Sequence, residues 1–230
     1  MLAPWLSPAF SAVLSGDAGL LAWLGVASIS YVGYVLLGVL LLDLLSYVLH
    51  RVFHQVPLLW RLHQVHHSDS AVNASTHFRQ HPVQHVVFPL MQLPLLWMLG
   101  ISGVSWVLYA ALSTGAQLWQ HMEAGESAQV NRWLGFVLVT PAAHRTHHDQ
   151  RREFHDRNYG TLFSFWDRVL GTYVAAPAKS QLGLRHLSSA TRTTNLVSFV
   201  DCLRMPFQST TSPSDSSAPV PFHTHLQGKK

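Results

Sequence analysis

The segment DLLSYVLHRVFHQVPLLWRLHQVHH, residues 43–67, decides the fold, because it joins a long apolar stretch to two histidine motifs. Its polar residues Asp43, Tyr47, His50 and His54 follow one another at intervals of four, three and four. This spacing predicts a single stripe on one face of a helix that runs out of the apolar stretch. We therefore expect the stripe to cross a membrane surface.

Pro57 ends this helix, and Leu58–His67 is expected to form a second one. The second helix carries an HxxHH motif at His63, His66 and His67, three rings placed on an arc of roughly 100°. Adjacent histidines point apart, so His66 and His67 can each serve a different ion. A neutral imidazole offers one ring nitrogen to a metal.

A second HxxHH motif follows Pro141 and is expected on a short helix over Ala142–Asp149. One catalytic zinc needs only about three protein ligands. Eight clustered histidines therefore indicate two metal ions. They are His50, His54, His63, His66, His67, His144, His147 and His148.

Two long stretches without formal charge indicate membrane spans, and only 11% of all residues are charged. Gly19–Leu42 is long enough for one span, since a span needs about 20 apolar residues. Pro82–Gln120 is long enough for two, with Gly100–Gly103 as the turn of a helical hairpin. Met1–Gly16 can add another. The expected fold is all-α, an integral-membrane helical bundle of three to four spans with a cytosolic histidine-rich helical cap.

The cationic residues lie on one side of these spans. All 15 Lys and Arg residues fall between Arg51 and Arg79 or from Arg132 onward. By the positive-inside rule both segments face the cytoplasm. Anionic lipid headgroups then explain the net charge of +4 without nucleic acid. The absence of a cation before Arg51 disfavours a cleaved signal peptide.

Cys202 is the only cysteine, so no internal disulfide or cysteine-held cluster can form, and electrons must come from another protein.

The chain divides into segments by composition. The segments are residues 1–49, N-terminal membrane span or spans; 50–81, cytosolic histidine motifs; 82–121, transmembrane hairpin; 122–207, cytosolic histidine-motif cap; and 208–230, a Ser-, Thr- and Pro-rich tail expected to be disordered.

The order of these motifs resembles the fatty acid hydroxylase and sterol desaturase superfamily of membrane oxygenases over about residues 43–173. The matching patterns are DxxxYxxHRxxH from Asp43, WxxHxxHH from Trp60, NxxTxxRxHP from Asn73, and Pro141, His144, Arg145, His147 and His148 followed by Asn158, Tyr159 and Gly160 and by Trp166, Asp167, Gly171, Thr172 and Tyr173.

The resemblance implies a four-helix membrane anchor capped by a dinuclear site with two iron ions, in which zinc can appear after purification. It implies nine metal ligands: His50, His54, His63, His66, His67, His121, His144, His147 and His148. It also implies supporting or additional ligand roles for Asp43, Gln117, His81, Arg79, Asp149, Asn158 and Asp167. Some family members have a histidine where Gln117 stands, and Asp43 is the first candidate to hold a ligating ring.

The function implied is a dioxygen-dependent lipid hydroxylase or desaturase that receives electrons from a reductase with a cytochrome b-type or ferredoxin-type carrier. A sterol, a fatty acyl or sphingoid lipid, an ether lipid and a carotenoid all remain open as substrates. The motif from Asn73 to Pro82 favours a sterol-desaturase-like member, by analogy.

Two other classes are weighed against an oxygenase. A membrane zinc hydrolase typically shows HExxH, and the chain has no His-Glu pair. A non-enzymatic metal-binding or electron-carrying membrane protein remains the alternative. Isolated histidines are usually surface or satisfied core residues, and Trp97, Trp106 and Trp119 are expected as membrane anchors. The isolated histidines are His77, His85, His155, His186, His223 and His225.

Overall fold

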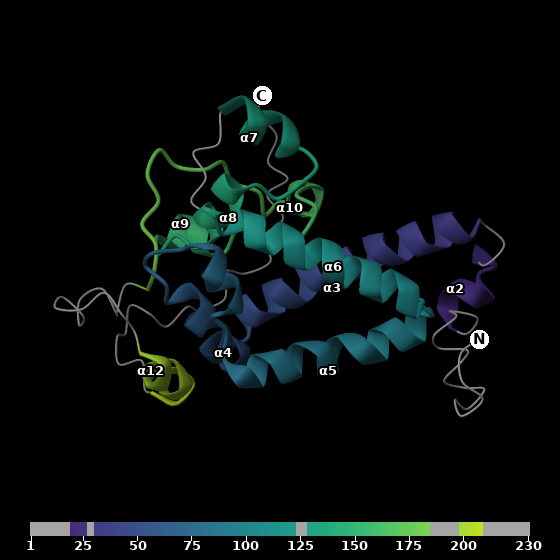
Figure 1. The fold of residues 1–230 in the computed structure, drawn as a ribbon, viewed down its shortest axis with the longest axis horizontal. Coiled ribbons are helices and arrows are strands. Elements are labelled where there is room, and N and C mark those ends of the chain that lie inside the picture. Colours follow the sequence, from purple (N-terminus) through teal and green to yellow (C-terminus); the bar gives the residue numbers. More distant parts are fainter. Residues whose placement is uncertain (1–18, 27–29, 123–127, 185–197, 209–230) are drawn as a thin grey trace, which may run out of the picture.

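Helix α3, Tyr31–Gln55, joins the apolar end of the molecule to its histidine end (Figure 1). Ser30 caps its start by accepting a hydrogen bond from the backbone N–H of Gly33. The extended backbone of Val56 and the following Pro57 end it, because proline cannot continue the hydrogen-bond ladder. The polar stripe that begins at Asp43 therefore lies on the same unbroken helix as the apolar residues before it.

The computed structural model describes residues 19–26, 30–122, 128–184 and 198–208. Within these ranges it contains ten α-helices, two 3₁₀ helices and two isolated β-bridges. The expected all-α fold is confirmed for this part of the chain. Besides α3, the elements are α2 Leu20–Trp23, α4 Pro57–His67, η2 Ala74–Phe78, α5 Pro82–Leu99, α6 Gly103–Gln120, α7 Ala128–Leu134, α8 Pro141–His147, α9 Arg152–His155, α10 Phe165–Val169, α12 Phe199–Arg204 and η3 Met205–Phe207.

Helices α5 and α6 form the expected hairpin, and its turn is where the sequence places it. Gly100 ends α5 with a φ of 77°, a left-handed conformation that glycine adopts without steric cost. Ser102 begins α6 by accepting a hydrogen bond from the backbone N–H of Ser105. Tyr34 of α3 donates to the Gly100 carbonyl, which holds the turn against the neighbouring helix.

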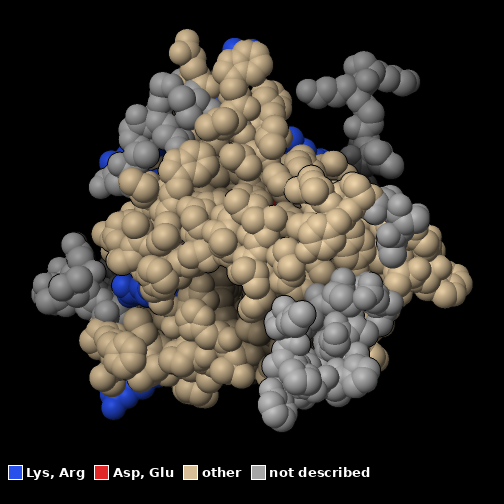
Figure 2. All heavy atoms as spheres, turned by 45° about the vertical axis from the view of Figure 1, so that its right-hand side comes forward, with Lys and Arg blue, Asp and Glu red and all other residues tan. Residues whose placement is uncertain are grey.

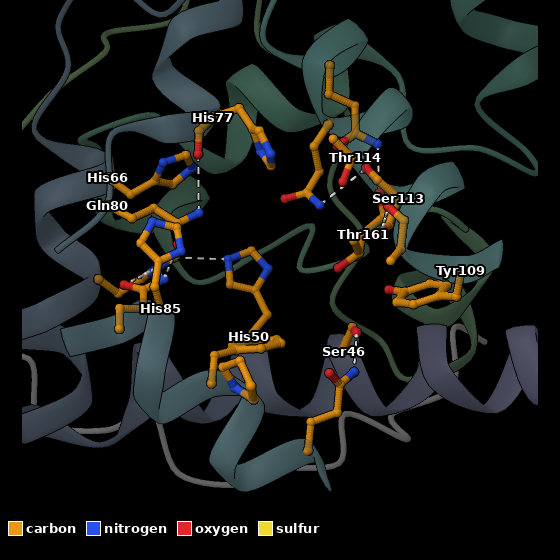
Figure 3. A pocket seen from close by; sticks show the side chains of 18 of the residues that line it. Ser46, His50, His66, His77, Gln80, His85, Tyr109, Ser113, Thr114 and Thr161 are labelled. Carbon is orange, nitrogen blue, oxygen red and sulfur yellow. Dashed lines mark hydrogen bonds between the residues drawn. The ribbon is translucent and has the colours of Figure 1, made fainter. Parts of the chain in front are cut away.

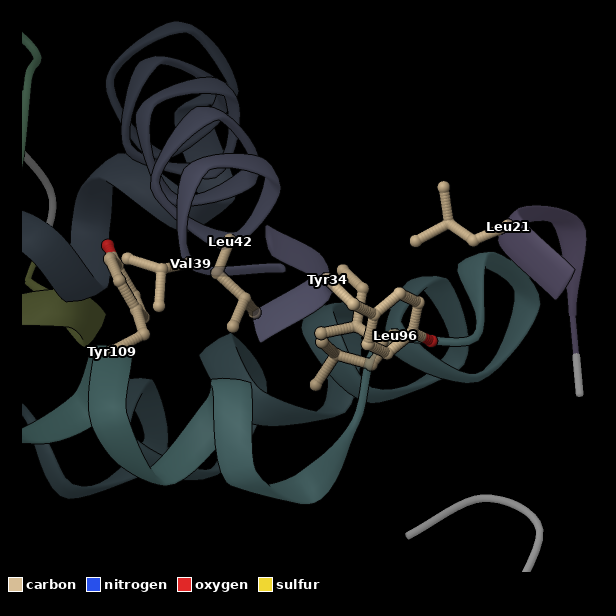
Figure 4. Packing of buried hydrophobic residues seen from close by; sticks show 7 residues of the cluster. Leu21, Tyr34, Val39, Leu42, Leu96 and Tyr109 are labelled. Carbon is tan, nitrogen blue, oxygen red and sulfur yellow. The ribbon is translucent and has the colours of Figure 1, made fainter. Parts of the chain in front are cut away.

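The hairpin packs closely on α3. A Cβ added to Gly38 would lie 2.4 Å from the Ser105 hydroxyl, so only glycine permits this approach of α3 to α6. Leu42, Leu96 and Tyr109 belong to the buried apolar cluster that joins α3, α5 and α6 (Figure 4). This cluster fixes the position of α6, whose last turn leads to His121.

Among the described helices, two are long and apolar enough to cross a membrane, α3 and α5. The sequence predicted three to four spans, and α6 falls short of that criterion because its Ser, Thr and Gln residues lower its mean hydropathy. The prediction of a span over Gly19–Leu42 also differs from the structure, where α2 is short and α3 begins at Tyr31 and continues past Leu42 to Gln55. Met1–Gly16 and the tail from residue 209 lie outside the described residues.

The outer faces of these helices are apolar. Figure 2 shows one face of the molecule on which Lys and Arg lie near the margins of a largely uncharged surface. Large exposed side chains on α3 and α5 include Leu36, Leu90 and Trp97. An exposed apolar surface of this extent is typical of contact with lipid or another protein.

The opposite end of the molecule carries α4, α8, α9 and α10 (Figure 1). Helix α4 packs against η3, and Met205 of η3 and Leu184 bury Val65. Pro57 and Pro141 occupy the first positions of α4 and α8, where a missing N–H costs nothing. Each helix thus begins with the proline itself, one residue before the predicted starts at Leu58 and Ala142, and α8 ends at His147 instead of the predicted Asp149.

Candidate metal centre

Four helices bring nine histidines into one buried cluster. Their ligand atoms fall into two groups, and within each group these atoms lie within 4.8 Å of one another. We call them the five-histidine group, His50, His54, His63, His67 and His147, and the four-histidine group, His66, His121, His144 and His148. These are the nine residues that the resemblance indicated as ligands.

The four-histidine group has the tighter geometry. The Nε2 atom of His121 lies 3.3 Å from that of His66 and 3.0 Å from that of His144. The Nε2 atoms of His144 and His148 are 3.1 Å apart. Two nitrogens that bind one ion at about 2.0–2.1 Å are separated by about 2.9 Å at a right angle and by about 3.4 Å at the tetrahedral angle. The spacing fits ligands that share a single ion.

The five-histidine group combines residues from α3, α4 and α8. The Nε2 atoms of His50 and His63 lie 3.1 Å apart, and the ring centroids of His54 and His147 are 4.6 Å apart. Within α3 and within α4, the paired histidines are four residues apart, so both members face the same side of their helix.

Adjacent histidines separate into different groups. His66 belongs to the four-histidine group and His67 to the five-histidine group, with their rings at 89°. His147 belongs to the five-histidine group and His148 to the four-histidine group, and their rings are also at 89° to each other. Each HxxHH motif therefore contributes to both groups, as the sequence predicted from the divergence of neighbouring side chains.

The second ring nitrogen of several of these histidines is held by the backbone. A carbonyl oxygen only accepts, so in each pair the ring Nδ1 must donate and Nε2 is left for a metal. The pairs are His50 with Tyr159 at 2.9 Å, His66 with Thr76 at 3.1 Å, His121 with Gln117 at 2.6 Å and His147 with Arg157 at 2.7 Å. His63 instead contacts a side chain, the Gln84 amide, whose Oε1 and Nε2 atoms lie 3.3 and 3.1 Å from His63 Nδ1.

The buried cluster also contains polar atoms without a partner. Both ring nitrogens of His67 and the Nε2 atoms of His54 and His147 are buried without a hydrogen bond. Burial, with a smaller effect of the neighbouring imidazoles, lowers the pKa of His67 and His148 well below the ordinary value. Neutral imidazoles with free lone pairs are costly to bury unless something binds them. This donor set fits one metal ion per group, and imidazole suits iron and zinc alike.

Asp43 supports the site through a loop and not through a histidine. Its carboxylate accepts hydrogen bonds from the backbone N–H groups of Leu162 and Phe163 at 2.9 and 3.0 Å. Trp166 Nε1 and the Tyr109 hydroxyl also donate to it. The sequence suggested that Asp43 hydrogen bonds a ligating histidine. In the structure it accepts hydrogen bonds from the backbone of Leu162 and Phe163 instead.

Asp167 and Asn158 shape the turn that supplies a carbonyl to His50. Asp167 accepts hydrogen bonds from the N–H groups of Tyr159 and Gly160, at 2.7 and 2.8 Å. Asn158 has a φ of 53° and donates to the carbonyls of Ala143 and Val174, at 3.2 and 3.0 Å. Both residues thus act on the histidine cluster through the Tyr159 backbone.

The other predicted supporting residues lie outside both groups. Arg79 donates to Ser68 and lies 3.9 Å from Asp69. Asp149 forms an ion pair with Arg151 at 2.7 Å. His81 caps α5, and its ring nitrogens contact the backbone of Val83 and Leu203. The Gln117 amide donates to the Ser113 carbonyl at 3.2 Å.

His155 was expected to be an isolated histidine, but it lies against the cluster. Its ring centroid is 5.3 Å from that of His54 and 4.6 Å from that of Trp60. The neighbouring Asp156 approaches His54 Nδ1 to 3.5 Å. A histidine next to an aspartate, seven residues after the last histidine of the second HxxHH, was the available sequence signal. His186, His223 and His225 lie outside the described residues.

A cavity of about 320 Å³ reaches both groups from between α3, α5 and α6 (Figure 3). His50 and His66 line it, one from each group. The rest of its wall mixes apolar and uncharged polar side chains, among them Gln92 and Tyr109. His77, His85 and Trp106, which the sequence favoured as surface, core or anchor residues, also line this cavity.

The histidine cluster lies within the part of the chain that resembles known proteins. The sequence model of a family described as fatty acid hydroxylase matches residues 35–172. Alkylglycerol monooxygenase from Homo sapiens is 33% identical over 140 residues, 61% of this chain and 30% of that protein. Ornithine lipid hydroxylase OlsE from Rhizobium tropici is 29% identical over 147 residues, 64% of this chain and 43% of that protein. The chain thus spans less than half the length of these relatives. No solved structure gives a significant match.

Proposed function

The chain belongs to the fatty acid hydroxylase family, and we propose that it is a membrane-bound oxygenase that hydroxylates a lipid with dioxygen. The observation that carries this proposal is the pair of histidine groups at the wall of one cavity. Two iron ions held there would supply the oxidant that an unactivated C–H bond requires. The names of the relatives, a monooxygenase and a hydroxylase, support hydroxylation over desaturation.

The residues of the chain prepare the site in three ways. Backbone carbonyls orient the rings of His50 and His147 so that Nε2 faces the interior. Burial keeps imidazoles such as His67 neutral and therefore able to bind a metal. The apolar walls formed by residues such as Phe88 and Pro89 limit water near the reacting carbon.

The side chains that line the cavity indicate the chemical class of the substrate. Amide and hydroxyl groups such as those of Gln84, Gln92 and Ser113 line it, and none of the described residues in its wall carries a formal charge. Such a wall can hydrogen bond an uncharged polar group while an alkyl chain extends between the helices. Alkylglycerol monooxygenase and ornithine lipid hydroxylase are named for polar lipids. These observations favour a polar lipid over the sterol that the motif from Asn73 suggested.

We also propose how the enzyme is oriented in the membrane and which kind of protein supplies its electrons. We place three to four spans in the membrane with the histidine-rich end in the cytoplasm, as the Lys and Arg distribution favours. Electrons come from a separate reductase with a cytochrome b-type or ferredoxin-type carrier, since Cys202 alone can hold no redox cluster. A single-cysteine probe at Ser70, in a Cys202→Ser background, should label with an impermeant thiol reagent only after lysis.

Oxygen-18 labelling tests the activity. Cells that express the wild-type protein are given ¹⁸O₂, and their lipids are compared by mass spectrometry with those of cells that express His148→Ala. A lipid that gains one ¹⁸O atom only with the wild type supports the proposal. His225→Ala is the matched control, because His225 belongs to the Ser-, Thr- and Pro-rich tail and to neither histidine motif. Bound metal without any labelled lipid would favour the non-enzymatic alternative.

A further inference from the structure

A third set of metal-binding side chains lies beside the five-histidine group. His54, His155 and Asp156 have ligand atoms within 4.8 Å of one another. The His155 ring packs edge-on against Trp60, and its centroid lies 5.4 Å from that of His67. The set therefore shares His54 with the five-histidine group.

Ring nitrogens without a hydrogen bond indicate that this set can bind a metal ion. The side chain of His54 is fully buried, and neither of its ring nitrogens has a hydrogen bond. One nitrogen can face the five-histidine group while Nδ1, 3.5 Å from the Asp156 carboxylate, faces the third set. The His155 ring lies against His54, with the two ring centroids 5.3 Å apart, so its imidazole is within reach of an ion held by His54 and Asp156.

Exposure changes across the three sets. The four-histidine group is buried, and in the five-histidine group only His50 is partly exposed. Neither His155 nor Asp156 is buried, and 27% of the Asp156 side chain is exposed. The large cavity opens between α3, α5 and α6, whose outer faces are apolar, and this is an unfavourable route for a hydrated cation. A metal ion needs another way to reach the buried imidazoles.

We propose that His155 and Asp156 form a metal-loading site, where a divalent cation binds first and from which it passes to His54 and the five-histidine group. The inference rests on the proposed metal centre. The carboxylate attracts the hydrated ion, and His155 replaces one of its waters. His54 then binds through a ring nitrogen as the remaining waters and the Asp156 oxygen leave. The transfer is ligand exchange without oxidation or reduction.

The charges around the site are compatible with this role. Asp149 is paired with Arg151, so this carboxylate does not compete for the ion. The Arg157 guanidinium donates to the Gly171 carbonyl. The Tyr159 hydroxyl contacts Asp156 at 3.5 Å, which leaves carboxylate lone pairs for a cation.

Stopped-flow loading with cobalt tests the proposal without reference to oxygenation. Full-length metal-free protein in nanodiscs is mixed anaerobically with Co²⁺, and the visible absorption of bound cobalt is followed. His155→Gln and Asp156→Asn should load about 10-fold more slowly than the wild type and reach the same final content of about two ions per chain. His155→Asp, which keeps a metal-binding side chain, should recover most of the rate.

Glu153→Gln provides the matched control. Glu153 lies on α9 with His155, is exposed, and belongs to none of the three sets. Its replacement removes the same charge as Asp156→Asn and should leave the loading rate within about twofold of the wild type.

The outcomes separate the two proposals. Equal loading rates in the wild type, His155→Gln and Asp156→Asn would overturn the loading site while leaving the metal centre intact. A lower final cobalt content in either variant would also overturn it, because the residue would then be a permanent ligand or a support for one. Failure of the wild type to bind cobalt would overturn the metal centre itself, and the loading site with it.

Discussion

The two histidine groups differ in what builds them and in how far they lie from solvent. The five-histidine group takes rings from α3, α4 and α8 and borders the partly exposed His155 and Asp156. The four-histidine group takes rings from α4 and α8, adds His121 after α6, and is buried throughout. The five-histidine group thus depends on α3, which runs out of the apolar region, and the four-histidine group depends on the α5–α6 hairpin, which is followed by His121. The difference predicts that the groups lose metal independently.

Loss of a ligand should have the largest effect. His67→Ala removes a ring from the five-histidine group and His148→Ala one from the four-histidine group. Each variant should hold the ion of the altered group so weakly that anaerobically purified protein retains about one metal ion per chain instead of two, as measured by elemental analysis, and should lose oxygenation. His85→Ala should keep both ions. Loss of both ions in either variant would contradict independent groups.

His121→Ala tests the contribution of the hairpin. It leaves three ligands in the four-histidine group, which is still enough for a weakly held ion. We expect metal affinity in that group to fall by at least about 10 to 100 fold, with the five-histidine group unchanged. Competitive chelator titration of the two ions measures this. A weaker ion in the five-histidine group would show that the groups are coupled.

Gln84→Leu separates side-chain support from backbone support. His63 in the five-histidine group contacts the Gln84 amide, whereas His66 and His121 in the other group are held by carbonyls. The substitution should lower metal affinity in the five-histidine group by about 10 fold and leave the other group intact. Gln84→Glu, which keeps an acceptor for His63, serves as the control. Equal affinities in all three proteins would contradict this role for the amide.

Asp43→Asn should have the smallest effect on metal content. An Asn side chain keeps one acceptor oxygen, so some of the donors among Phe163, Leu162 and Trp166 lose their partner. Each unsatisfied buried donor costs about 1–3 kcal/mol, so the unfolding temperature should fall while both ions remain. Thermal unfolding measures the change, with the exposed Asp201→Asn as control. Selective loss of one ion would show that Asp43 supports a particular group.

The sequence by itself determined the local elements and the identity of the clustered histidines. Helical spacing placed His63 and His67 on one face of α4, and Pro57 and Pro141 marked the starts of α4 and α8. The turn at Gly100 was also readable, because helix ends require particular backbone conformations. These features depend on residues close together in the chain, which is why spacing and residue type suffice to predict them.

Only the tertiary structure decided which histidines share a group and what supports them. Backbone carbonyls such as that of Thr76 hold the ring of His66, and a carbonyl leaves no trace in residue identity. Asp43 acts through a segment 119 residues away in the chain, and His155 gains its place by the packing of α9 on α8. Distances between helices depend on how their side chains interdigitate. That information belongs to the whole fold and not to any one motif.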